Sequence, residues 1–144
     1  MKDIQSVTVW GDSVMKGVIF DERKGRYALL PESGAEKASK ALGLRLRNRS
    51  RMGCTVTKGL SIVKKDLQQP VDSEVALLEF GGNDSDYDWA QVAASPDDVH
   101  QPKTPLPLFE NELTDMVRTV RQKGITPVMM TLPPIHANRY FEFF

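Results

Sequence analysis

Short apolar runs alternate with longer amphipathic stretches along the chain. The apolar runs predict strands at residues 7–10, 44–48, 75–80 and 127–132, and the amphipathic stretches predict helices at 33–42, 57–67 and 108–123. Helices that alternate with strands are typical of βαβ units and a parallel sheet. The fold class predicted from this pattern is therefore α/β.

Local signals support the ends of two of these helices. Ser33 and Glu36 have the spacing of a capping box at the start of the first helix, and Gly43 follows its end. Gly124 closes the last helix in the same way.

The polarity of the strands indicates their order in the sheet. Residues 44–47 alternate apolar and charged side chains, as expected for a strand with one solvated face, whereas residues 75–78 are apolar on both faces and should be central. Residues 128–130 are equally apolar, so we expect them to be buried.

Residues with catalytic chemistry follow the first three strands. Gly11-Asp12-Ser13 comes directly after the first strand, Gly53 follows the second, and Gly81-Gly82-Asn83-Asp84 follows the third. Open α/β sheets build their sites at the carboxyl ends of strands. A backbone amide at Gly53 and the side-chain amide of Asn83 would there supply two oxyanion donors beside a Ser13 nucleophile.

These motifs, in this order, resemble the SGNH, or GDSL, hydrolase family. Ser13 matches the family's nucleophile, Gly53 its backbone oxyanion donor and Asn83 its side-chain oxyanion donor. The resemblance runs from Val7 to about Pro134. It implies a serine esterase or acylhydrolase with a three-layer, flavodoxin-like parallel sheet in the order 2-1-3-4-5, acting without metal or cofactor.

The remaining motif residues are expected to support the geometry. Gly11 would allow a tight turn, and Asp12 would hydrogen-bond to amides around the nucleophile. Gly81 and Gly82 would permit a close backbone approach, and Asp84 would brace the first loop.

The family's fourth motif, Asp-x-x-His near the carboxyl terminus, has no match. Asp97-Asp98-Val99-His100 has the letters, but it lies in a proline-rich stretch before the last predicted helix and strand, so we do not assign it to catalysis. His136 also comes too early in the fold. We therefore expect residues 1–144 to form a single SGNH domain that is truncated at its C-terminus and lacks its last strand and helix. The fourth strand would then be an open edge through which chains self-associate.

Composition adds few constraints. The 144 residues carry no formal net charge, which gives no overall attraction to nucleic acid or to anionic membranes. Cys54 is the single cysteine and is expected to be a small buried thiol without a disulfide partner. No leader and no run of about 18 apolar residues is present in the sequence, so the default expectation is a cytoplasmic protein with no membrane partner.

Several alternatives remain open from the sequence. The long segment 85–107 is either a substrate wall or a surface excursion, and the acidic residues at its start do not form a calcium loop, because Trp89 and Ser95 occupy the positions of the required Gly and Glu. The domain could bind an acylated ligand without turning it over. A less favoured alternative is a phosphate- or nucleic-acid-binding module that uses Arg45, Arg47, Arg49 and Arg51. For the esterase, small acyl esters, including acetylated carbohydrates, are the expected substrates.

Overall fold

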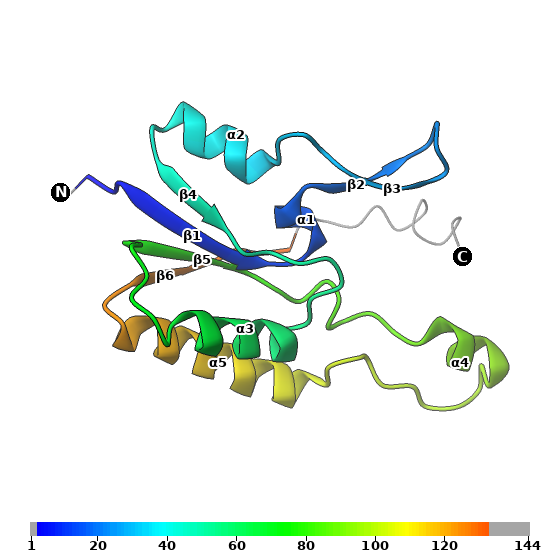
Figure 1. The fold of residues 1–144 in the computed structure, drawn as a ribbon. Coiled ribbons are helices and arrows are strands. Elements are labelled where there is room, and N and C mark those ends of the chain that lie inside the picture. Colours follow the sequence, from blue (N-terminus) through cyan, green and yellow to red (C-terminus); the bar gives the residue numbers. More distant parts are fainter. Residues whose placement is uncertain (1–2, 133–144) are drawn as a thin grey trace.

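The computed structural model describes residues 3–132 (Figure 1). His136, and the predictions made for residues beyond 132, lie outside that range. The elements in chain order are β1 (Ser6–Gly11), α1 (Ser13–Lys16), β2 (Val18–Asp21), β3 (Arg26–Leu29), α2 (Gly34–Ala41), β4 (Arg45–Asn48), α3 (Val56–Asp66), β5 (Val75–Glu79), α4 (Trp89–Ala94), α5 (Leu106–Gln122) and β6 (Thr126–Met129).

The main sheet is parallel and has the order β4-β1-β5-β6. Helix α2 lies over one face, and α3 and α5 lie over the other, which gives three layers (Figure 1). All four predicted strands and all three predicted helices are present, and the order 2-1-3-4 agrees with the flavodoxin-like prediction. As expected, β5 is central and β4 is an edge strand with alternating exposure.

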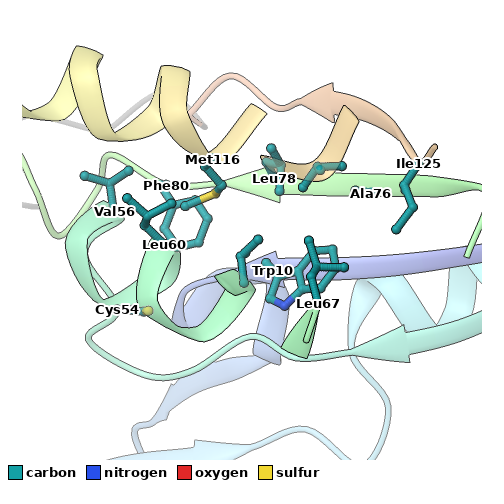
Figure 2. Packing of buried hydrophobic residues seen from close by; sticks show 12 residues of the cluster. Trp10, Cys54, Val56, Leu60, Leu67, Ala76, Leu78, Phe80, Met116 and Ile125 are labelled. Atoms are coloured by element: carbon teal, nitrogen blue, oxygen red, sulfur yellow. The ribbon is translucent and has the colours of Figure 1, made fainter. Parts of the chain in front are cut away.

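The hydrophobic core lies between the sheet and the pair α3 and α5 (Figure 2). Trp10 of β1 and Leu78 of β5 are register partners that both belong to it. Helix α3 approaches the sheet closely at Gly59, where an added Cβ would lie 2.3 Å from the Phe80 ring. The small residue therefore fixes how near α3 can come to β5.

The predicted helix ends are confirmed. The Ser33 hydroxyl accepts from the Glu36 amide, and the Glu36 carboxylate accepts from the Ser33 amide, which completes the capping box. Gly43 and Gly124 have φ values of 66° and 75°, the left-handed region that suits glycine after a helix.

Three features were not predicted. A hairpin of β2 and β3 follows α1, and its Phe20 and Tyr27 rings meet edge-on with centroids 5.6 Å apart. The strands are only four residues long and lack a clear alternation of buried and exposed positions, so the sequence gives little periodicity to detect. Helix α1 is equally short, and α4 is a short helix within the predicted long loop, capped by the Asp88 side chain.

The expectation that residues 128–130 are buried is wrong. Val128, Met129 and Met130 are 43%, 61% and 40% exposed. The reason is that β6 pairs with β5 on one side, whereas no strand within residues 3–132 pairs with its other edge. Self-association through this edge stays a prediction.

Candidate active site

The first loop of the site joins β1 directly to α1. Ser13 is the first residue of α1, and Asp12 is its N-cap, with one carboxylate oxygen, Oδ1, accepting from the Val14 amide at 2.8 Å. The predicted hydrogen bond from a local amide to Asp12 is therefore present. The Ser13 side chain lies at this turn and is partly exposed.

Gly11 is needed for a different reason from the one predicted. It does not have a positive φ, so a special turn conformation does not require glycine. An added Cβ would instead lie 2.9 Å from Oε2 and 3.0 Å from the backbone oxygen of Glu79. Gly11 leaves the space that the Glu79 side chain occupies.

The second loop follows β4 and contains Gly53. Gly53 has φ of 65°, the left-handed region that suits glycine, and no atom lies within 4 Å of the position of an added Cβ. The Arg51 amide donates to the Gly11 carbonyl at 3.0 Å, which holds this loop against the first. The Asn48 side chain donates to the Met15 carbonyl at 2.8 Å and so fixes α1 as well.

The third loop follows β5, and its Asn83 connects the other two. Its Nδ2 atom donates to Oδ2 of Asp12 at 2.9 Å and to the Cys54 carbonyl at 3.4 Å. Asp12 precedes Ser13 and Cys54 follows Gly53, so the structure brings the three predicted residues to one end of the sheet. At Gly82 an added Cβ would lie 3.4 Å from Asp12 Oδ2, an ordinary van der Waals distance, so the close approach predicted for Gly82 does not require glycine.

Asp84 braces the second loop, not the first as predicted. Its two carboxylate oxygens accept from the Val56 amide at 2.9 and 3.1 Å, at the start of α3. The side chain is 1% exposed. Asp84 therefore anchors the segment that carries Gly53, and the first loop is held by Asn83.

Glu79, the last residue of β5, is a component that sequence reasoning missed. It is 1% exposed, its Oε2 accepts from the Asp12 amide at 3.2 Å, and its Oε1 is buried without a hydrogen-bond partner. Burial raises the pKa of Glu79 to about 7, against the effect of the Asp12 amide and with a further contribution from the Asp12 carboxylate. The available signal was an acidic residue inside a run that is otherwise apolar on both faces.

A cavity of about 610 Å³ lies beside the third loop. Its wall includes Gly81 and Asp84 of that loop and Tyr87 of the segment 85–107, and most of the lining is apolar, from Phe80, α5 and the end of β6. Tyr87, Pro102 and Thr104 of the long segment line this cavity, whereas Ser13, Gly53 and Asn83 do not, so the choice between a substrate wall and a surface excursion stays open.

The other candidates from the sequence are engaged elsewhere. The His100 ring lies 2.8 Å from the Ser95 carbonyl in the segment between α4 and α5. In the acidic segment, Asp86 pairs with Lys103 at 2.6 Å. Cys54 is 3% exposed, and burial raises the pKa of its thiol, as expected for a structural cysteine.

Two of the four arginines in the cluster form ion pairs. Arg45 pairs with Asp72 at 2.7 Å, and Arg49 pairs with Asp66 at 2.6 Å. These pairs reduce the charge that Arg45 and Arg49 offer to a polyanion, and the phosphate- or nucleic-acid-binding alternative stays an untested prediction. Between residues 3 and 132, every helix is too short or too polar to cross a membrane.

No family model matches the sequence, and none of the curated proteins matches it. Solved structures do match the fold. AlinE4, an SGNH-hydrolase family esterase, shares 23% identity with a TM-score of 0.64 and aligns with 93% of this chain and 63% of its own. TesA shares 22% identity, with a TM-score of 0.61, over 96% of this chain and 67% of its own. A lipase/acylhydrolase from Enterococcus faecalis shares 17% identity, with a TM-score of 0.64, over 96% and 63%.

These likenesses define the class of fold. Residues 3–132 have the fold of the SGNH hydrolases, with the parallel sheet and flanking helices that the sequence resemblance implies. The chain spans about 63% of the length of AlinE4. The roles of Ser13, Gly53 and Asn83 remain predictions, which we take up next.

Proposed function

We propose that the protein is a serine acylhydrolase in which Ser13 is the nucleophile. The observation that carries the proposal is the position of Asn83, whose amide contacts both Asp12, next to Ser13, and Cys54, next to Gly53. A nucleophile and two oxyanion donors at one point are the requirements of acyl transfer. The esterases and acylhydrolases with the same fold support this chemistry.

In the proposed reaction, Ser13 Oγ attacks the carbonyl carbon of an ester and passes its proton to a base. The carbonyl oxygen becomes an oxyanion, which the Gly53 amide and the Asn83 side chain stabilise. Collapse of this intermediate breaks the bond to the alcohol, which leaves with a proton. Water then attacks the acyl group on Ser13 and releases the acid, which restores the serine.

The two hydrogen bonds of Asn83 suggest how its amide serves the oxyanion. The bond to Asp12 Oδ2, at 2.9 Å, has ordinary length, whereas the contact with the Cys54 carbonyl, at 3.4 Å, is long. We expect Asp12 to hold the amide while the N–H now near Cys54 turns to the oxyanion. The Asn83 amide would thus give up its weak hydrogen bond to the Cys54 carbonyl and form a stronger one to the charged oxyanion.

The base is the component that we do not assign to a described residue. The family resemblance implies a histidine oriented by an aspartate, and the His100 ring lies instead against the Ser95 carbonyl. Ser13 needs such a base because a serine hydroxyl is a weak nucleophile at neutral pH.

For the substrate we propose small acyl esters, including acetylated carbohydrates. The apolar cavity beside Gly81 and Asp84 would accept the acyl group. Rates with p-nitrophenyl acetate, butyrate and hexanoate test its size. A preference for hexanoate would contradict the small-acyl proposal but not the serine chemistry.

The experiment that tests the function is intact mass spectrometry of the folded chain after exposure to a fluorophosphonate. We expect one adduct, which Ser13→Ala abolishes and which Ser61→Ala, a change of an exposed serine on α3, leaves intact. Asn83→Ala should slow ester hydrolysis about a hundredfold or more, because one oxyanion donor is lost. Asn111→Ala, an exposed asparagine of α5, is its control.

The opposite result is equally informative. A folded chain without an adduct would overturn hydrolase activity for these 144 residues. A domain that binds acylated ligands without hydrolysing them would then become the better interpretation, and binding of a non-hydrolysable acyl amide would test it.

A further inference from the structure

Glu79 has an unusual position for an acidic residue. It ends the central strand of the sheet, directly opposite Gly11 in the register of β1 and β5, and it is almost completely buried. One oxygen accepts from the Asp12 amide, and the other has no hydrogen-bond partner. An ionised carboxylate in such a place leaves a buried charge without compensation, which favours the protonated acid.

The elements around Glu79 supply one charged neighbour. Of the described charged groups, Asp12 is the one that affects the pKa of Glu79. Lys16 of α1 lowers the pKa of Glu36 in α2 instead, together with Lys40.

The charged groups of the other neighbouring segments act elsewhere too. Arg47 of β4 lowers the pKa of Asp66. Arg51 of the second loop lowers the pKa of the Cys54 thiol, and Asp84 of the third loop raises it. On the other side of β5, residues 126–132 carry no charged side chain. Glu79 therefore faces a carboxylate and no balancing cation within residues 3–132.

Asp12 links Glu79 to Asn83. The backbone of Asp12 donates to Glu79, while its side-chain Oδ2 accepts from Asn83 and its Oδ1 accepts from the Val14 amide. The space for this arrangement depends on Gly11, whose missing Cβ would otherwise meet Glu79. A change at Glu79 therefore reaches the Asn83 amide through a single intervening residue.

We propose that Glu79 is a positioning residue of the site: buried against Asp12 as the neutral acid, it keeps Asp12 in place and thereby sets the orientation of the Asn83 amide. The inference rests on the proposed function only where it treats Asn83 as an oxyanion donor. With its proton in place, Glu79 is neutral and accepts from the Asp12 amide, and Asp12 stays fixed as the acceptor for Asn83. When the proton leaves to solvent, two carboxylates face one another in a buried space, and their repulsion disturbs the acceptor of the Asn83 amide.

The test follows the side-chain amide of Asn83 by ¹H–¹⁵N NMR from pH 5.5 to 8.5, with the signal identified by its loss in Asn83→Ala. In the wild-type chain we expect the signal to shift with a midpoint near pH 7, which is the pKa of Glu79. In Glu79→Gln, which keeps the shape and an acceptor for the Asp12 amide but cannot ionise, the shift should disappear. An Asn83 signal that does not titrate in the wild-type chain, or still titrates in Glu79→Gln, overturns the proposal.

Two controls separate this effect from other ionisations. Glu110→Gln changes an exposed glutamate of α5 and should leave the titration unaltered. The double variant His100→Gln/His136→Gln removes both histidines of the chain and should also retain it. Loss of the titration in either control overturns the assignment to Glu79.

A second variant keeps the proposal testable if Glu79→Gln does not fold. Asp12→Asn removes the carboxylate that an ionised Glu79 repels, so the pH-dependent shift of the Asn83 signal should become much smaller than in the wild-type chain. A shift of unchanged size overturns the link through Asp12. The NMR result is independent of catalysis: a chain without a fluorophosphonate adduct but with this titration has lost only the hydrolase proposal, and the reverse result removes only the role of Glu79.

Discussion

Two acidic side chains flank β1, one on each side, and their surroundings differ. Trp10 and Gly11 are successive residues of β1 and so point to opposite faces of the sheet. On the Trp10 side, Asp66 of α3 accepts from the Trp10 indole at 3.0 Å and from Arg49 at 2.8 and 2.6 Å. On the Gly11 side, Glu79 accepts from a single backbone amide.

The pKa directions of the two groups follow from these partners. Burial alone would raise the pKa of Asp66, but the hydrogen bonds from Arg49 and Trp10 outweigh it and the pKa is lowered. Burial dominates for Glu79, whose pKa rises to about 7. The Arg49–Asp66 ion pair ties the second loop to α3. Glu79 has no balancing cation among the described residues and lies against Asp12, next to the candidate nucleophile Ser13. Perturbed ionisation of this kind is typical of functional sites.

Breaking the compensated pair should have the largest effect on stability. Asp66→Ala leaves the partly buried Arg49 without its anion and the Trp10 indole without its acceptor, so we expect the free energy of unfolding to fall by about 2–3 kcal/mol. Urea denaturation measures it. Asp72→Ala removes the exposed partner of Arg45 and should cost less than about 0.5 kcal/mol; equal losses in the two variants would contradict the distinction.

Replacing Glu79 by a residue that cannot ionise should change the free energy of unfolding, relative to wild type, by about 2 kcal/mol between low and high pH. The ordinary pKa of a glutamate is 4.5, against about 7 here, so between these values the folded state retains a proton that the unfolded state releases. Stability of the wild-type chain therefore falls as pH rises through this window, and the loss is complete above pH 7.

The variant Glu79→Gln lacks this proton, so its stability relative to wild type should improve from pH 5 to pH 8. Thermal or urea unfolding at the two pH values gives the difference. Glu110→Gln provides the matched control, with no change in relative stability expected. A relative stability of Glu79→Gln that is the same at both pH values would show that Glu79 is ionised in the folded chain at pH 5.

Placing a side chain at Gly11, next to Glu79, should lower the free energy of unfolding by a comparable or slightly smaller amount. In Gly11→Ala, the new Cβ would lie too close to the Glu79 carboxylate and backbone, at 2.9 and 3.0 Å, so we expect a loss of about 1–2 kcal/mol. Gly34→Ala is the control, because nothing lies within 4 Å of its Cβ position in the first turn of α2. That variant should be neutral or slightly stabilised by helix propensity, and an equal loss in both would refute the crowding argument.

The framework of the fold could be predicted from sequence because its signals are local. The apolar run of β5, the capping box at Ser33 and the glycines after α2 and α5 each depend on residues within a few positions of one another. The loops after β1, β4 and β5 were predicted to meet because parallel strands end at a common edge. The hairpin of β2 and β3 was missed, since two short strands carry little periodicity.

The sequence by itself predicted the order of the four main-sheet strands and the three longer helices, the glycine-rich loops between them, and Ser13, Gly53 and Asn83 as candidate site residues. Only the tertiary structure decided what each side chain contacts. Asp84 turned out to hold α3, Gly11 proved necessary for space, and β6 lies exposed because no described strand pairs with its outer edge. Glu79 is the clearest case: its ionisation depends on burial and on Asp12, which is 67 positions away in sequence, and a local pattern contains neither quantity.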